Sequence, residues 1–238
     1  VGDRSIDWLS NRPDNEPFCL WVSFPDPHHP FDCPEPWSSL HRPDDVDLPK
    51  FLEKDLNKRP WWHEQSLEGE PDLNDPTLKR FRKQGSRMPD QSEAQLREMT
   101  ANYYGMISLI DHNVGRIMSQ LKKKGLLDET IVIYTSDQGF YLGEHGWFDK
   151  RFIYDESFKT PLLIRWPNKI KAGITNDEMV QNLDFAQTFL EAAGIDAPND
   201  MQGESLIPLL TESGEDWTRD AVYYHYYEYP SVHMAKRH

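Results

Sequence analysis

The sequence lacks any long apolar run. Its longest apolar stretches, such as residues 18–24 and 131–134, fall far short of the roughly 20 residues that a bilayer-spanning helix needs. Cysteine is scarce as well, because only Cys19 and Cys33 occur in 238 residues. Two thiols make no disulfide framework, and two unrelated thiols are the simpler interpretation. We therefore predict no membrane span, and the cysteines do not indicate a compartment.

Basic residues are in deficit. The chain carries 26 Lys and Arg against 40 Asp and Glu, a formal net charge of −14. Proteins that bind nucleic acid need a basic face, so this balance argues against a nucleic-acid partner. A few cations gathered at one place could still bind a small anion. The sequence shows no signal peptide and starts at Val1 rather than methionine, from which we expect that both ends are cut.

Apolar periodicity predicts one long helix. The helix starts at Ser92, which forms an S-x-x-Q capping box with Gln95, and it ends before Gly125. Its apolar residues recur at steps of three and four, which predicts one buried stripe: Leu96, Met99, Tyr103, Met106, Ile110, Val114, Ile117 and Leu121. A shorter helix is expected over about residues 184–193, closed by Gly194.

Short β-rich runs predict strands at residues 18–24, 130–135, 161–166 and 221–229. The first is expected to be buried, with Cys19 inside it, and the second to be central because it does not alternate with polar residues. Strands alternating with helices indicate an α/β sheet with mixed or parallel pairing. Residues 32–91 are rich in Pro and charge, and are expected to form a long excursion with short helical pieces.

Polar residues that could carry chemistry follow two of these strands. Asp137 and Gln138 follow the second strand, at the edge where α/β sheets place ligand sites. Two neighbouring hard oxygen donors suit Ca²⁺ or Mg²⁺, although a turn with a capping aspartate has the same pattern. Lys150 lies just beyond two glycines, and could be a counter-charge for an anion or an ordinary surface lysine. His28 and His29, held between prolines, suit an anion contact or proton donor, and equally two exposed loop histidines.

These segments together resemble the type I sulfatases of the alkaline phosphatase superfamily. The resemblance runs from about Phe18 to His238 and rests on TSDQGFYLGEHGWFDKR at 135–151, PLLIR at 161–165 and GESLIPLL at 203–210. Four residues of the long helix fit the same pattern: Tyr103, Tyr104, Asp111 and Gly115. The resemblance implies an α/β fold with an alkaline-phosphatase-like sheet sandwiched by helices, incomplete at the N-terminus. Residues 1–210 would be the C-terminal part of the catalytic domain, and 211–238 the start of a small C-terminal α+β subdomain.

The resemblance also implies roles for single residues. Asp137 and Gln138 fall on two calcium ligands, although many members have Asn or His at the second position. Lys150 falls on the lysine that contacts the sulfate group. His28, in the pattern His-x-Pro, falls on the histidine that contacts sulfate and helps to protonate the leaving oxygen, which makes His29 a bystander. His145 is a further substrate-binding candidate, and the next candidate for the proton donor.

The C-terminal tail resembles the glycan-acting branch, especially N-acetylglucosamine-6-sulfatase-like members. An aromatic run at 223–230 is followed by His233, Arg237 and His238, which would contact a sulfated carbohydrate. An amphipathic edge strand with a solvated basic end is the alternative. The family suggests a periplasmic, secreted or lysosomal-type compartment, and the sequence does not indicate an oligomeric state.

The family nucleophile is missing from the sequence. It is a formylglycine made from Cys or Ser in the motif Cys/Ser-x-Pro-x-Arg, and neither Cys33, followed by Pro-Glu-Pro-Trp, nor Cys19 fits. Asp44 and Asp45 do not follow a first strand as the family's aspartate pair does. We expect the nucleophile, its arginine and further metal ligands N-terminal to Val1, and the 238-residue chain alone to be inactive.

The leading interpretation is a calcium-assisted sulfuric ester hydrolase that acts on a sulfated glycan. A phosphonate or phosphate monoester hydrolase on the same scaffold is one alternative. A non-catalytic module that binds anions or glycans is the other.

Overall fold

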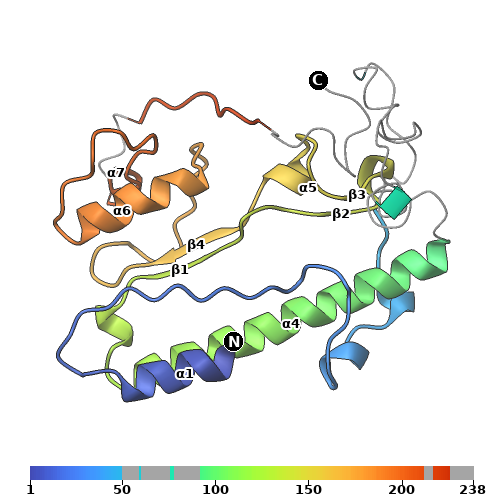
Figure 1. Ribbon diagram of the computed structural model, residues 1–238, viewed down its shortest axis with the longest axis horizontal. Coiled ribbons are helices and arrows are strands. Elements are labelled where there is room, and N and C mark those ends of the chain that lie inside the picture. Colours follow the sequence, from blue (N-terminus) through green and yellow to red (C-terminus); the bar gives the residue numbers. More distant parts are fainter. Residues whose placement is uncertain (50–58, 60–75, 78–91, 212–216, 226–238) are drawn as a thin grey trace. The chain divides into compact units, whose positions relative to one another are not determined.

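The computed structural model describes residues 1–49, 59, 76–77, 92–211 and 217–225 (Figure 1). The chain divides into two compact units. The first combines Val1–Leu127 with Gln138–Lys159, and the second combines Asp128–Asp137 with the part that begins at Thr160. The predicted α/β class is confirmed as a mixture of helix and sheet. No described helix is both long and apolar enough to cross a bilayer.

The first unit is built on the long helix α4 (Glu93–Lys123). Its start is the predicted capping box, in which the Ser92 side chain accepts from the Gln95 N–H and the Gln95 side chain accepts from the Ser92 N–H. Its end is also as predicted, since Gly125 has a φ of 70° and lies just beyond the last turn. Local sequence therefore sets both ends of this helix.

The helix α1 (Gly2–Asn11), which the sequence patterns did not predict, packs along α4 (Figure 1). A Cβ at Gly2 would overlap the Asn113 side chain, so a glycine lets the two helices approach closely. The Asp3 carboxylate pairs with Arg116 at 2.5 Å. The Lys124 ammonium pairs with Asp14, just beyond α1, at 2.8 Å.

Two 3₁₀ turns follow, η1 (Trp37–Ser39) and η2 (Pro43–Asp45), and both contact α4. They are short helical pieces of the kind that was predicted for the excursion at residues 32–91. Most of residues 50–91 lie outside the described residues.

The segment at 18–24 is extended but is not a strand, so this prediction is wrong for the described part of the chain. No described residue forms a ladder with it. Its side chains alternate in exposure, with Cys19 exposed and Trp21 74% exposed. An extended run becomes a strand only where a second segment supplies hydrogen-bond partners, and the pattern of one segment does not reveal that partner.

The second unit contains two of the expected strands. β1 (Val132–Thr135) pairs antiparallel with β4 (Leu162–Arg165), and Val132 lies opposite Arg165. Both strands are shorter than predicted, and β1 has β4 as its only partner among the described residues. The predicted central position of this strand and the predicted mixed or parallel pairing are therefore not found in the described part, where both ladders are antiparallel. Residues 221–225 form no strand, and the rest of the expected fourth strand lies outside the described part.

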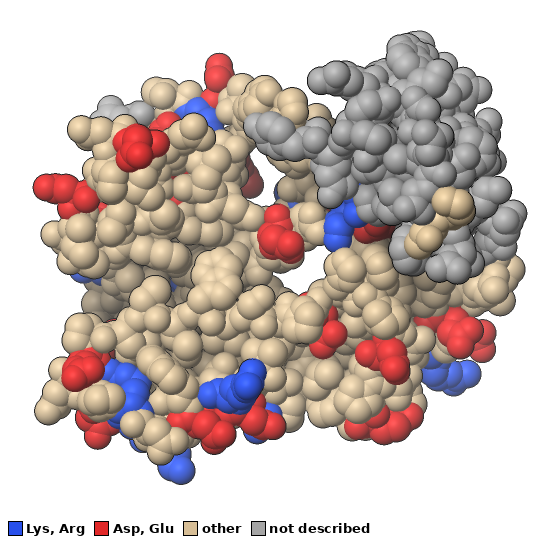
Figure 2. Space-filling model, in the orientation of Figure 1, with Lys and Arg blue, Asp and Glu red and all other residues tan. Residues whose placement is uncertain are grey.

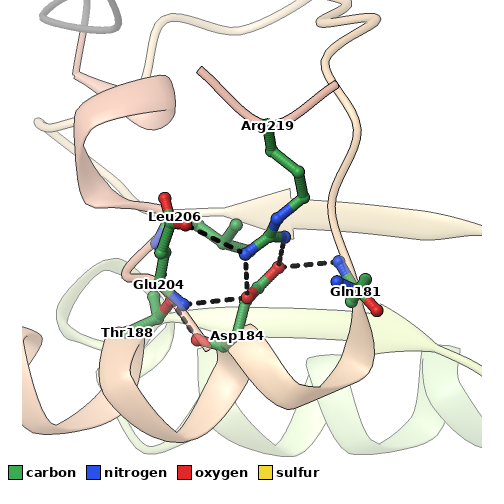
Figure 3. Close-up of polar contacts among 6 residues, drawn as sticks. All are labelled: Gln181, Asp184, Thr188, Glu204, Leu206 and Arg219. Atoms are coloured by element: carbon green, nitrogen blue, oxygen red, sulfur yellow. Dashed lines mark hydrogen bonds and ion pairs between the residues drawn. The ribbon is translucent and has the colours of Figure 1, made fainter. Parts of the chain in front are cut away.

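Helices η5 (Asn182–Asp184), α6 (Phe185–Ala192) and α7 (Ile207–Leu210) complete the second unit. The last residue of η5 is Asp184, whose buried carboxylate accepts hydrogen bonds from two guanidinium nitrogens of Arg219 at 2.5 and 2.9 Å (Figure 3). The same carboxylate accepts the Gln181 and Glu204 N–H groups at 2.7 and 2.9 Å. Burial raises the pKa of Asp184, but these hydrogen bonds outweigh burial and lower it below its ordinary value.

Candidate active site

The segment after β1 forms a short hairpin within the first unit. β2 (Tyr141–Leu142) pairs antiparallel with β3 (Phe148–Asp149), and η4 (Glu144–Gly146) makes the turn. Gly143 and Gly146 have φ values of 122° and 76°. Because this backbone region disfavours residues with a Cβ, the turn itself explains both glycines of the motif.

The hairpin is anchored by two buried groups, Tyr141 and Ser157. The Tyr141 hydroxyl donates to the Phe152 carbonyl at 2.7 Å, and burial raises the pKa of this phenol. Ser157 belongs to α5 (Asp155–Phe158) and accepts two N–H groups at 2.9 Å each. Gly139 donates to its carbonyl and Arg151 donates to its hydroxyl, so Ser157 holds both ends of the segment.

Lys150 is a largely buried, paired lysine rather than a solvated one. Its side chain is 13% exposed, and Nζ lies 3.8 Å from Oδ1 of Asp149. Asp149, with a side chain only 2% exposed, also forms a close ion pair with Arg151. Asp149 and Arg151 have φ values of 79° and 108°, which residues other than glycine adopt only where the surroundings impose them. These three residues, here called the Asp149–Arg151 turn, carry two positive charges against one negative charge.

An aromatic cluster joins this turn to the histidine loop. Phe31 packs edge-on against Tyr103, Phe140 and Phe148 with centroid distances of 5.7, 5.7 and 6.0 Å. The rings come from the loop after Pro30, from α4 and from both ends of the hairpin segment. Each such pair contributes about 0.5–1.5 kcal/mol beyond area burial, so the cluster fixes segments that are distant in sequence.

His29 lies beside this cluster, 6.3 Å from the Phe140 ring. Partial burial lowers the pKa of His29, and the charge of His28 lowers it further. The negative charge of Asp149 raises the pKa of His29, whereas the positive charges of Lys150 and Arg151 lower it, as burial does. Charges of the turn therefore act directly on the histidine loop, so these two predicted site segments lie close together in one unit.

His28 stacks on His29 with a centroid distance of 4.2 Å. Its Nδ1 lies 2.8 Å from the His29 carbonyl oxygen. A carbonyl oxygen can only accept, so Nδ1 carries a proton and Nε2 is the nitrogen that can take up or release one. Both rings are exposed. The structure brings both histidines to the turn, and the assignment of His28 as the acting residue stays a prediction.

His145 is held against other residues of its own unit. Its ring stacks on Tyr154 at 4.1 Å, and Nε2 lies 3.3 Å from a Glu156 carboxylate oxygen. The side chain is mostly buried, and its backbone has a φ of 56°. These contacts explain why the hairpin turn has a histidine here, and substrate binding by His145 stays a prediction.

Asp137 and Gln138 are neighbours in the chain, and Asp137 is exposed at the end of the β1 segment. The backbone carbonyl of Asp137 accepts from the Asn182 side chain at 3.1 Å, and the preceding carbonyl of Ser136 accepts from the same group at 3.2 Å. Asn182 therefore sets the backbone from which the Asp137 carboxylate projects. Sequence patterns missed Asn182, which carries no motif of its own.

The donor chemistry at this position fits a hard divalent cation only in part. A carboxylate and an amide oxygen are suitable donors, but Ca²⁺ takes six to eight oxygens. Among the described residues, no group of three or more His, Cys, Asp and Glu side chains could hold a metal ion. The remaining oxygens would have to come from groups other than these two side chains.

The other predicted site residues are His233, Arg237 and His238, and they lie outside the described residues. The Cys33 thiol is buried, and burial together with nearby carboxylates, Asp32 foremost, raises its pKa.

The residues of this site to which the sequence analysis gave no role are Asp149, Arg151 and Phe140. The signal was present as the charge triplet Asp149-Lys150-Arg151, because three adjacent charges that end a motif rich in glycine and aromatic residues point to a constrained turn. Phe140 gave no comparable signal, since an aromatic residue after a glycine is ordinary.

Comparison with known proteins places these features in a family. Residues 143–238 match the family model described as "N-sulphoglucosamine sulphohydrolase, C-terminal". The chain is similar to an N-acetylglucosamine-6-O-sulfatase of Bacteroides thetaiotaomicron, with 36% identity over all of this chain and 50% of that protein. It is also similar to an arylsulfatase of Clostridium perfringens, with 33% identity over 94% of this chain and 43% of that protein.

Solved structures agree. A protein in complex with its substrate D-glucosamine-2-N,6-O-disulfate has a TM-score of 0.76 and 34% identity, over 99% of this chain and 56% of that one. A phosphonate monoester hydrolase of Agrobacterium radiobacter has a TM-score of 0.74 and 28% identity, over 92% of this chain and 43% of that one. The chain thus spans about half the length of the curated relatives that it matches. On this similarity in sequence and in fold, the chain belongs to the sulfatase family of the alkaline phosphatase superfamily.

Proposed function

We propose that this chain carries part of the active site of a sulfuric ester hydrolase that removes sulfate from a sulfated carbohydrate. The observation that carries the proposal is the joining of the histidine loop to the Asp149–Arg151 turn by the aromatic cluster. A proton donor and a cation are the two groups that a leaving oxygen and a sulfuryl group require.

Each residue has a defined part in this proposal. The Lys150 ammonium faces the sulfate oxygens as a compact counter-charge. His28 contacts the leaving oxygen through Nε2 and gives it a proton as the S–O bond breaks. Asp137 and Gln138 supply two oxygens to a Ca²⁺ ion, which when bound would neutralise negative charge on the sulfate. The formylglycine nucleophile expected of the family has no counterpart among the two cysteines of this chain.

The substrate class rests on the relatives. One is named an N-acetylglucosamine-6-O-sulfatase, and one solved structure contains a glucosamine that carries N- and 6-O-sulfates. We infer that the sulfate ester lies on an amino sugar of a glycan, with His145, His233, Arg237 and His238 as candidate contacts. A periplasmic, secreted or lysosomal-type compartment is part of the same proposal.

The test is hydrolysis by the complete encoded protein of N-acetylglucosamine 6-sulfate, an aryl sulfate and an aryl phosphonate monoester. The proposal expects release of inorganic sulfate from the sugar, and loss of turnover when a chelator removes Ca²⁺. Release of sulfate from the aryl ester alone would contradict the sugar assignment while keeping the reaction.

A phosphonate monoester hydrolase is the second candidate, because one such enzyme matches the fold with a TM-score of 0.74. Faster turnover of the phosphonate than of either sulfate would favour it. Binding of sulfated sugar without turnover of any ester would instead indicate a non-catalytic glycan-binding module.

A further inference from the structure

The geometry of the Asp149–Arg151 turn points to a role for its carboxylate: we propose that Asp149 is a positioning residue that holds the Lys150 ammonium at the sulfate-binding place. This inference rests on the proposed function, because it presumes that Lys150 meets the sulfate. It concerns a residue to which the sequence analysis gave no role.

The first step of the argument is burial. The Asp149 side chain is 2% exposed and the Lys150 and Arg151 side chains are 13% and 15% exposed. Charges removed from water to this extent must be paired, because an unpaired buried charge is strongly destabilising. A flexible lysine is therefore confined by a fixed partner of opposite charge.

The second step is the difference between the two pairs. Arg151 makes a close ion pair with Asp149, whereas the Lys150 nitrogen stays 3.8 Å away, beyond the ~2.7–3.2 Å of a hydrogen bond. The carboxylate therefore makes its close contact with Arg151 and a longer ion pair with Lys150. At this longer distance the carboxylate orients the Lys150 ammonium without a direct hydrogen bond to it.

The third step is the backbone. Asp149 and Arg151 have positive φ values on either side of Lys150. Aspartate and asparagine tolerate this region better than most residues, but arginine gains nothing from it. A strained conformation on both sides of one lysine is expected where the direction of that lysine matters, and the Ser157 hydroxyl fixes the second of these residues through the Arg151 N–H.

The experiment is a double-mutant cycle in the complete encoded protein, with Asp149→Asn, Lys150→Ala and the double variant. Asparagine accepts the same backbone conformation and has nearly the same shape, so the main change is the lost charge. We expect Asp149→Asn to lower kcat/KM for an aryl sulfate by about 10- to 100-fold, as a misplaced reacting group does. Inhibition by inorganic sulfate should weaken in parallel.

The double variant gives the decisive reading. If Asp149 acts through Lys150, adding Asp149→Asn to Lys150→Ala changes kcat/KM by no more than about twofold. The same large loss on both backgrounds would overturn the inference, because Asp149 would then act independently of Lys150. Wild-type levels of turnover and sulfate inhibition in Asp149→Asn would overturn it as well.

Controls separate positioning from general stability. Asp184→Asn removes another buried carboxylate from an arginine pair, and it should lower Tm while kcat/KM per folded molecule stays at the wild-type value. If Asp149→Asn does not fold, Arg151→Gln tests the same point. Without its close partner Arg151, the Asp149 carboxylate would pair more closely with Lys150. Lys150 would then bind sulfate less well, and inhibition by sulfate would weaken. Unchanged sulfate inhibition in Arg151→Gln would overturn the inference. A wild-type protein that hydrolyses no sulfate ester would instead overturn the proposed function.

Discussion

Each unit contains a buried carboxylate that is paired with arginine, and the two differ in how they are built. In the second unit, Asp184 lies on ordinary helical backbone and accepts two guanidinium nitrogens and two backbone N–H groups. In the first unit, Asp149 lies at a φ of 79° and pairs with cations from its own sequence neighbours. The Asp184 site joins distant segments, whereas the Asp149 site shapes a single turn.

This difference separates stability from function. The Asp184 carboxylate binds residues 181, 204 and 219, which lie in separate segments of the second unit. Its loss should therefore mainly lower the free energy of unfolding. A carboxylate that pairs with the cations of its own turn joins no distant segments of the chain. Under the inference above, its loss should change ligand binding as well as stability. Figure 2 shows acidic and basic side chains interspersed over the described surface on one face.

The largest expected effect is kinetic and lies in the first unit. His28→Ala should lower the rate with a poor leaving group by about 10²–10⁴-fold, and the defect should shrink for a leaving group of low pKa, because less protonation is needed. Lys150→Ala should cause a loss that does not depend on the leaving group. His29→Ala is the matched control, and a larger loss in it than in His28→Ala would show that the histidines are assigned in the wrong order.

The next effect is thermodynamic and lies in the second unit. Asp184→Asn removes the buried charge partner of Arg219 and leaves only the more exposed Glu204 carboxylate, 3.6 Å from the guanidinium, to pair with it. The substitution should lower the free energy of unfolding by about 3–5 kcal/mol. Urea denaturation followed by fluorescence measures this loss. A change below about 1 kcal/mol would contradict the view that Asp184 closes the fold.

The contribution of Asp184 to stability should also depend on pH. The pKa of Asp184 is lower in the folded state than the ordinary value of about 3.9 in the unfolded state, so the unfolded chain binds the proton more readily. The stability from Asp184 is present above pH ~4 and is lost as pH falls toward its folded pKa. Denaturation midpoints between pH 6 and pH 3 should fall more steeply in the wild type than in Asp184→Asn, and equal slopes would refute the assignment.

The smallest effect is expected where a carboxylate pairs with arginine in solvent. Asp128 bonds to Arg165 at 2.6 Å, but its side chain is largely exposed. Asp128→Asn should change stability by at most about 1 kcal/mol. A loss as large as that of Asp184→Asn would mean that burial does not distinguish the two pairs.

Sequence patterns predicted the features whose causes are local. The capping box at Ser92 and the glycine at 125 each act within a few residues, and both were found as expected. Of the predicted apolar stripe of α4, four residues are buried and the other four are half-buried. The cores of β1 and β4 were found as well, because short β-rich runs identified them.

The features that were missed depend on distant partners. Residues 18–24 have the pattern of a strand, but pairing is a property of two segments. Asp149 lies beside the lysine expected to bind sulfate, and a negative charge there disfavours anion binding unless a cation pairs with it, as Arg151 does. The packing of the histidine loop near the Asp149–Arg151 turn depends on contacts of Phe31 and Phe140. Hydrophobic periodicity in the sequence does not predict these contacts.

The double use of Ser157 has a dynamic consequence. Its carbonyl and hydroxyl accept the N–H groups of Gly139 and Arg151, and a Cβ at Gly139 would overlap the neighbouring Glu156 carbonyl. The intervening hairpin is thus fastened at both ends to a single residue and should open as one cooperative piece. Amide hydrogen exchange at Gly139 and Arg151 should accordingly share one opening free energy, and Ser157→Ala should release Arg151 first.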